Sequence, residues 1–235
     1  MIVIQQFTRN SPSCSYLPWE QSNTHFIIAA DISPTEYETR MNAGWRKFGP
    51  MLFRPECPAC TACQPIRIPV ERFAPDRSQT RALKRNADLR VEFAHPTVDS
   101  ARLALYQRYH QAQAVSKGWE RDEKDAEDYA FQFLVNSIPS VEVSVWHGDT
   151  LWAVALADLT PNTVSAVYHY HEPMCRERSL GTFVILHTVE LARRLGKQYV
   201  YLGYYVAGCR SMEYKTRYRP SEILGTSGNW DPLKV

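Results

Sequence analysis

The second half of the chain places strand-like and helix-like hydrophobic patterns in one order, and this order constrains the fold most. Three strand-like segments follow one another, with the turn residues Gly148-Asp149 and Pro161-Asn162 between them. A helical pattern follows over residues 180–195 and ends at Gly196, before a fourth apolar segment. The predicted strands cover residues 141–145, 151–159, 163–170 and 199–205. Antiparallel strands followed by a helix and a further strand predict an α+β fold.

The first half of the chain contains a strong helix signal. Ser33 can cap a helix and Glu36 completes a capping box with it. Apolar residues then recur about every four positions as far as Phe48, where Gly49-Pro50 ends the pattern. This spacing predicts one helix up to that point.

A domain boundary is predicted at His95-Pro96. Before it, a short strand over residues 66–70 contains Pro69, which is typical of a sheet edge, and residues 77–90 form a basic helix or loop. After it, two helices are predicted between residues 98 and 135, ahead of the strands. We therefore predict an N-terminal domain over residues 1–95 and a C-terminal domain over residues 96–235.

Composition and targeting signals favour a folded cytoplasmic protein. The chain has 235 residues, 44% of them hydrophobic, and a net charge of +2, which alone does not argue for nucleic acid. No stretch resembles a secretory signal or reaches the roughly 20 apolar residues of a membrane span. The sequence does not fix the oligomeric state.

Three of the six cysteines form the spacing Cys57-x-x-Cys60-x-x-Cys63 on a proline-containing loop. Thiolates at this spacing can bind zinc or an iron–sulfur cluster, both of which commonly take four ligands. Cys14 or an outside molecule is a candidate for the fourth ligand. The alternative is that the three thiols only pack and hold no metal.

The chain resembles the aminoacyl-tRNA–protein transferases, and most closely their bacterial aspartate/glutamate leucyltransferase branch, which is related to the eukaryotic arginyl-transferases. The resemblance extends over nearly the whole chain, and its motifs together are highly specific. They include Gly44-Trp45-Arg46-Lys47-Phe48-Gly49, Phe53-Arg54-Pro55 with the three cysteines, Ser179-Leu180-Gly181-Thr182, Tyr201-Leu202-Gly203-Tyr204-Tyr205 and Tyr214-Lys215.

This resemblance implies a fold and a reaction. The fold would be a pair of GNAT-like halves with mixed, mostly antiparallel sheets and flanking helices. The reaction would add an amino acid, leucine foremost, from charged tRNA to proteins that begin with Asp or Glu and so mark them for degradation. Eukaryotic members are linked to an iron–sulfur cluster, but Tyr16-Leu17 replaces one of their cysteines here. Ser211 also stands where bacterial members usually have lysine.

The reaction determines which residue types to look for. An aminoacyl ester is already activated, so positioning and oxyanion stabilisation matter more than a strong base. Tyr204 and Tyr205 are the predicted catalytic residues, and strand alternation would place Tyr201 and Tyr205 on one face. The residues predicted to bind substrate, mainly the acidic side chain of the acceptor, are Arg54, Tyr201, Lys215 and Arg217. His169 and His171 are expected to be solvated.

Basic residues before the domain boundary are predicted to bind tRNA phosphates, namely Arg77, Arg81, Lys84 and Arg85. Other functions stay open at this point. One is arginyl transfer by the same chemistry, another is a GNAT acetyltransferase that uses acetyl-CoA, and a third is a non-catalytic RNA-binding module held together by a metal. Phe183 argues against acetyl-CoA, because that fold needs a small residue there for the pyrophosphate.

Overall fold

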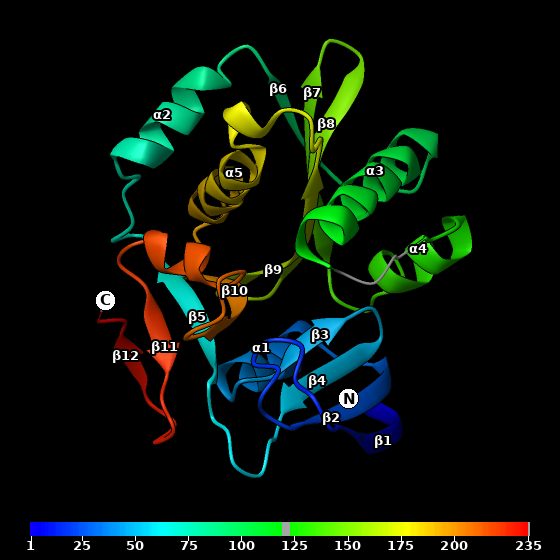
Figure 1. Ribbon diagram of the computed structural model, residues 1–235, viewed down its shortest axis with the longest axis vertical. Helices are drawn as coiled ribbons and strands as arrows, with labels where there is room; N and C mark the ends of the chain where they lie inside the picture. The colour runs from blue at the N-terminus through cyan, green and yellow to red at the C-terminus, as the bar shows by residue number, and fades with distance from the viewer. Residues whose placement is uncertain (119–122, 235) are drawn as a thin grey trace.

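The computed structural model describes residues 1–118 and 123–234, and its strands form two sheets (Figure 1). The smaller sheet is antiparallel, in the order β1-β2-β4-β3, with α1 (Pro34–Asn42) packed on it. Its strands are β1 (Ile2–Ser11), β2 (Ser22–Asp31), β3 (Arg46–Phe48) and β4 (Met51–Pro55).

The larger sheet has eight strands in the order β12-β11-β5-β10-β9-β8-β7-β6. All neighbours are antiparallel except β9 and β10, which run parallel. Its strands are β5 (Cys63–Pro69), β6 (Arg90–Ala94), β7 (Ser140–His147), β8 (Thr150–Leu159), β9 (Thr163–His171), β10 (Tyr199–Val206), β11 (Glu222–Leu224) and β12 (Trp230–Pro232).

Helices cover both faces of the larger sheet (Figure 1). Alternate residues of β8 pack in opposite directions: Val154 and Leu156 contact the layer of α3 (Ser100–Lys117) and α4 (Ala126–Phe133), whereas Ala153 and Ala155 contact the layer of α5 (Leu180–Arg194). The remaining helices are α2 (Arg77–Arg85), which packs on α5, and the 3₁₀ turns η1 (Arg176–Arg178) and η2 (Glu213–Arg217). No helix in the described ranges is long and apolar enough to cross a membrane.

The predicted capping box is confirmed, but the helix that follows it is shorter than predicted. Ser33 and Glu36 bond each other's backbone N–H groups at the start of α1. The helix ends at Asn42, and Gly44 then adopts φ +90°, which turns the chain into the short strand β3. The apolar spacing continues as far as Phe48 because both α1 and β3 face buried side chains, so a helical period was the wrong interpretation after Asn42.

The two sheets do not divide at the predicted domain boundary. Both β5 and β6 precede residue 95 in the chain, yet both belong to the larger sheet. Between the sheets, α1 and the smaller sheet share one core cluster with Tyr201 of β10. The first half of the chain therefore contributes directly to the walls around β10.

Arg102 and Glu142 form a buried ion pair that joins α3 to β7. Nε of Arg102 lies 3.1 Å and 3.0 Å from the two carboxylate oxygens, and its Nη2 lies 2.5 Å from one of them. Removing one member of a buried pair leaves the other charge uncompensated, which costs about 3–5 kcal/mol. Because Arg102 also pairs with Asp99, the informative variant is Arg102→Met, which leaves the buried carboxylate of Glu142 without its partner and should lower the free energy of urea unfolding by that amount.

The control is Glu190→Gln, which removes an exposed carboxylate paired with Arg193 and Arg194 on α5. Exposed pairs contribute about 0–1 kcal/mol, so this variant should unfold nearly like the wild type. Equal losses in the two variants would contradict a special role for the buried pair.

Candidate active site

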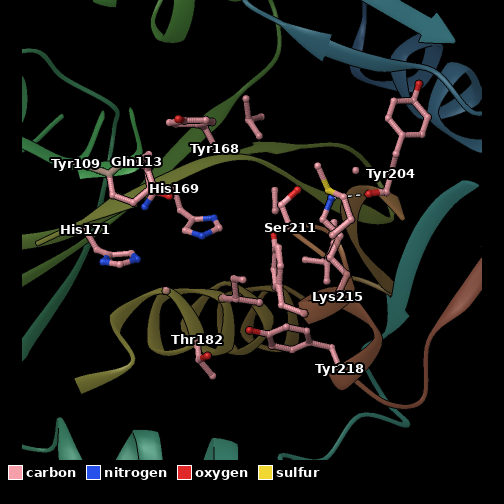
Figure 2. A pocket seen from close by; sticks show the side chains of 18 of the residues that line it. Tyr109, Gln113, Tyr168, His169, His171, Thr182, Tyr204, Ser211, Lys215 and Tyr218 are labelled. Atoms are coloured by element: carbon pink, nitrogen blue, oxygen red, sulfur yellow. Dashed lines mark hydrogen bonds between the residues drawn. The ribbon is translucent and has the colours of Figure 1, made fainter. Parts of the chain in front are cut away.

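A cavity opens where β9 and β10 separate. The two strands pair only over Tyr199–Thr163, Val200–Val164 and Tyr201–Ser165. The next residues of the two strands, 166–169 and 202–204, do not pair with each other and instead line a cavity of about 580 Å³. The first turn of α5, part of α3, η2 and the smaller sheet complete its walls (Figure 2).

A bulge in β10 decides which side chains reach this cavity. Tyr201 is opposite Arg67 of β5, but Tyr204 rather than Gly203 is opposite Pro65, so one extra residue is inserted. Gly203 has φ +81° at this point. The bulge places Tyr204 on the same side as Tyr201, while Tyr205 packs in the core on the α5 side. The predicted sharing of a face by Tyr201 and Tyr205 is therefore wrong.

Lys215 of η2 is a buried amine in the wall of the cavity (Figure 2). The residue is only 6% exposed, and its Nζ donates to the carbonyl oxygen of Tyr204 at 2.5 Å. It forms no ion pair with a carboxylate in the part of the chain that the structure describes. Burial, assisted by the nearby charge of Arg46, lowers the pKa of Lys215 to about 7. A substantial neutral fraction is therefore present at physiological pH.

Arg46 of β3 is a second buried cation in the cavity wall. It is 5% exposed, and its guanidinium lies over the rings of Tyr201 and Tyr204, at 4.9 and 5.5 Å from their centroids. Nη1 donates to the carbonyl of Trp45 at 2.7 Å, and Nη2 donates to that of Gly203 at 3.2 Å. Nε has no hydrogen-bond partner. No carboxylate among the described residues pairs with it.

The charge of the cavity wall is one-sided. Five basic residues line it and no Asp or Glu does, within the described ranges; the basic residues are Arg46, Lys47, Lys117, Arg176 and Lys215. The charge of Lys47 is balanced by Asp158, a residue outside the cavity lining, whose carboxylate oxygen lies 3.1 Å from Nζ. A cavity of this kind suits an anionic ligand.

Arg46 and Lys215 differ from the other buried basic residues, which are paired with carboxylates. Of the buried basic side chains in the described chain, three have a buried carboxylate partner: Lys47 with Asp158, Arg67 with Glu222 and Arg102 with Glu142. Arg46 and Lys215 are the two that have none. Burying a charge without a partner costs several kcal/mol, so these two side chains are stabilised elsewhere or serve a ligand.

Two histidines of β9 lie against the start of α5 (Figure 2). A β-carbon on Gly181 would lie 3.3 Å from Nε2 of His171, a tight contact, and 3.6 Å from Nε2 of His169, so both imidazoles pack closely on this turn. Burial, with smaller contributions from nearby positive charges, lowers the pKa of His169 to about 3, and burial also lowers that of His171. Both rings are therefore neutral at pH 7, in contrast to the expected solvated histidines.

The predicted catalytic and substrate-binding residues are only partly brought together. Lys215 and Tyr204 line the cavity, but the ring of Tyr204 points away from it (Figure 2), and its hydroxyl donates to the carbonyl of Gly44 at 2.8 Å, with the carbonyl of Phe53 at 3.3 Å. The other four predicted residues lie outside the lining: Tyr201, Tyr205, Arg54 and Arg217.

Each of these four is engaged elsewhere. The hydroxyl of Tyr201 donates to Oδ1 of Asn42 at 2.6 Å, and Tyr205 packs in the core. Arg54 forms an ion pair with Glu56. Arg217 lines a separate hollow near α2 with Asp76 and Arg219. Their roles in binding stay predictions, and none of them is placed to act inside the cavity.

The predicted tRNA-binding residues share one exposed surface on α2. Arg77, Arg81, Lys84 and Arg85 are all exposed. Arg85 also donates to the carbonyl oxygen of Glu177 in η1, next to the lining residue Arg176. The basic surface therefore reaches the rim of the cavity at η1. Binding of tRNA there stays a prediction.

The predicted metal ligands gather near one another but do not form a ligand set. Burial, together with neighbouring sulfurs, raises the pKa of Cys63 to about 12, and those sulfurs belong to Cys14, Cys57, Cys60 and Cys209. Cys57 exchanges hydrogen bonds with the backbone of Asn23. Among the described residues, no three His, Cys, Asp or Glu side chains are arranged to hold a metal ion. A zinc ion or cluster stays a prediction, and these thiols as placed do not fit it.

Sequence reasoning missed Arg46 and the pair of histidines. Arg46 belongs to a motif that carries the family resemblance, but a helical interpretation of this segment gives no sign that its side chain reaches a cavity. His169 and His171 stand two residues apart on a predicted strand, which indicates one face, but their burial by α5 could not be read from spacing.

Comparison with known proteins places these residues in a family context. Residues 12–81 match the N terminus, and residues 101–225 the C terminus, of the family described as arginine-tRNA-protein transferase. An aspartate/glutamate leucyltransferase of Pseudomonas savastanoi is 43% identical over 223 residues, which cover 94% of this chain and 93% of that protein. One from Pseudomonas fluorescens is 41% identical over 214 residues, 90% of each chain.

A solved structure confirms the fold class. The crystal structure of FemX superposes with a TM-score of 0.55 at 7% identity, covering 93% of this chain and 86% of FemX. At that identity the likeness concerns the fold alone. The predicted α+β class with mixed, mostly antiparallel sheets and flanking helices is confirmed.

The bulge predicts a specific cost for a side chain at Gly203. An alanine there must adopt φ +81°, which costs about 1–2 kcal/mol in the left-handed region, whereas its β-carbon would lie 3.6 Å from Nζ of Lys215, an ordinary contact. Gly203→Ala should therefore lower the free energy of urea unfolding by that amount. Gly196→Ala, with φ +65° and open space around it, should lose a similar amount. An unchanged stability of Gly203→Ala would contradict the bulge.

Proposed function

The chain belongs to the arginine-tRNA-protein transferase family of aminoacyl-tRNA–protein transferases, and we propose that it transfers leucine from leucyl-tRNA to proteins that begin with Asp or Glu. Such a transfer marks the acceptor protein for degradation. Because charged tRNA is the donor, the cytoplasm is the proposed site of the reaction.

The observation that carries this proposal is the charge of the cavity. Five basic residues and no carboxylate line it in the described ranges, so it favours an acceptor with an acidic side chain. The same wall disfavours an arginyl donor, because a second guanidinium would be buried near Arg46 without a carboxylate to neutralise it. Apolar lining residues suit a leucyl side chain instead; they include Phe48, Phe53, Val167, Ile185, Leu202 and Met212.

Lys215 supplies a proton acceptor for the reaction. The neutral α-amine of the acceptor attacks the carbonyl carbon of the leucyl ester, and the neutral amine of Lys215 takes the proton that the attacking nitrogen loses. The tetrahedral intermediate then collapses, a peptide bond forms, and the bond to the ribose oxygen of tRNA breaks. Lys215 returns the proton to that oxygen, which leaves as a hydroxyl. No nucleotide is consumed.

The donor side of the proposed site is the region of α2, η1 and α3. The exposed basic residues of α2 would contact tRNA phosphates, and Arg85 connects them to η1 at the cavity rim. Arg176 and Lys117 line the adjacent part of the cavity. This path brings the aminoacylated 3′ end toward Lys215 while the rest of the tRNA stays outside.

The arrangement gives little support to acetyl-CoA as the donor. In that alternative the first turn of α5 would receive the pyrophosphate. Here His169 and His171 lie against Gly181 in that turn. The reason differs from the one predicted from sequence, because Phe183 is buried in the core and does not itself face the cavity.

An assay of donors against acceptors tests the proposed function. Purified protein is incubated with leucyl-tRNA or arginyl-tRNA and with peptides that begin with Asp, Glu, Arg or Ala, and peptide mass is measured. We expect leucine on the Asp and Glu peptides only. Transfer from neither tRNA to any peptide would refute the proposal, and a preference for arginyl-tRNA would refute the charge argument. Acetylation by acetyl-CoA without tRNA would support the alternative.

A pH profile tests the role of Lys215. Because neutral Lys215 accepts the proton, kcat/KM should rise as the pH increases through about 7. The α-amine of the acceptor titrates near roughly 7.7–8.0 and adds a second rise to the same pH profile. Acceptors with different amine pKa values therefore separate the rise due to Lys215 from the rise due to the acceptor. The limb near 7 should stay when the acceptor changes. Lys215→Met should remove it and lower kcat by about 100-fold or more.

Lys197→Met is the matched control, because Lys197 bonds the carbonyls of Thr160 and Pro161 away from the cavity. Its pH profile should equal that of the wild type. A Lys215→Met variant that keeps the limb near 7 would show that another group accepts the proton.

A further inference from the structure

We propose that Arg46 binds the side-chain carboxylate of the acceptor's first residue and thereby sets the preference for Asp and Glu. This inference rests on the proposed function and names the residue that its specificity requires. It starts from Arg46, a lining residue that is 5% exposed, whose guanidinium bonds the carbonyl of the lining residue Gly203 and has no carboxylate partner in the described chain.

The hydrogen bonds of Arg46 leave part of its donor capacity open. A guanidinium has five N–H donors, and here one goes to the carbonyl of Trp45 and one to that of Gly203. These bonds leave one N–H of each terminal nitrogen unused, and Nε, which is buried, also has no partner. The bonded carbonyls are neutral, so they fix the orientation of the group and leave its charge uncompensated. A planar guanidinium held in this way matches a carboxylate, which can accept two of its N–H groups.

The position of Arg46 relative to Lys215 matches the chemistry of an acidic N-terminal residue. Both side chains flank the bulge of β10: Arg46 bonds the carbonyl of Gly203, and Lys215 bonds the carbonyl of Tyr204. A β-carbon on Gly203 would lie 3.6 Å from Nζ of Lys215, so the space between the cations is kept free of a side chain. In Asp and Glu, the α-amine nitrogen and the carbon of the side-chain carboxylate are only three or four bonds apart. One such residue can therefore face both groups.

The other basic residues fit this role less well. Lys47 is already paired with Asp158, and Arg54 is paired with Glu56 outside the cavity. Lys117 and Arg176 stand at the end of the cavity formed by α3 and η1, on the proposed donor side. Arg46 is the remaining cation beside the proposed proton acceptor.

The test compares acceptor preference in the wild type and in Arg46→Met. For each, kcat/KM for leucyl transfer is measured with otherwise identical peptides that begin with Asp or Asn, because these differ in charge and hardly in shape. In the wild type, Asp should be preferred by at least about 30-fold. In Arg46→Met this ratio should fall to near 1, because Asp transfer drops to the level of Asn transfer.

Arg40→Met is the matched control. The guanidinium of Arg40 also lies over an aromatic ring, 5.3 Å from the centroid of Trp45, but Arg40 does not line the cavity. The control should keep the preference of the wild type. An Arg46→Met variant that loses Asp and Asn transfer equally, or keeps its preference, overturns the proposal. Loss of preference in Arg54→Met instead would also overturn it.

Two further measurements keep the proposal testable if Arg46→Met does not fold. Arg46→Lys retains a charge and should keep a preference for Asp, with kcat/KM for Asp about tenfold lower because a single ammonium replaces the bidentate group; unchanged transfer would overturn the proposal. In the folded wild type, the Asp peptide should bind at least about 30-fold more tightly than the Asn peptide. Equal binding would overturn the proposal, whereas failure of leucyl transfer by the wild type would instead refute the proposed function.

Discussion

The separation of β9 and β10 after three parallel residue pairs is the constraint on which the site depends. A sheet that stayed paired would leave no space between these strands. Here β10 remains bonded to β5 but inserts an extra residue, so its carbonyls at Gly203 and Tyr204 turn toward buried donors instead of toward a neighbouring strand. The backbone groups that the split leaves without sheet partners thereby hold the two cations of the site.

Those cations explain how a nearly neutral protein presents a strongly basic interior. The net charge is only +2, yet the cavity lining contains no acidic residue in the described chain. Other buried cations of the fold have carboxylate partners, as the Arg102–Glu142 pair shows. Arg46 instead lies over two tyrosine rings, which stabilise its charge. Burial lowers the pKa of Lys215, so this amine can be buried in its neutral form without an internal anion. The two unpaired basic groups therefore cost folding free energy, and a bound anionic ligand would offset this cost.

Much of the fold could be predicted from sequence, because periodicity and turn chemistry act locally. The strands of the second half, helix α5 and the capping box of α1 follow from such signals. Long-range events could not be predicted in this way. The insertion of β5 beside β10 depends on pairing between distant segments, and the bulge at Gly203 reverses the faces of Tyr204 and Tyr205 although the local pattern is unbroken. For the site, the motifs identify Lys215, whereas a helical period through β3 gives no sign that Arg46 reaches the cavity.

The central claim is that an acidic N-terminal residue binds beside neutral Lys215 in the split between β9 and β10. NMR titration of protein labelled with ¹⁵N-lysine tests it most directly, with the Nζ signal of Lys215 assigned by its loss in Lys215→Arg. The signal should titrate near pH 7 in the free protein. At pH 8, where the amine is mostly neutral, a saturating Asp peptide should shift this Nζ signal because its first residue lies beside the amine, and the matched Asn peptide, which lacks the carboxylate that Arg46 binds, should not. Titration near 10.4, as for an ordinary lysine, or an equal response to both peptides would contradict the account.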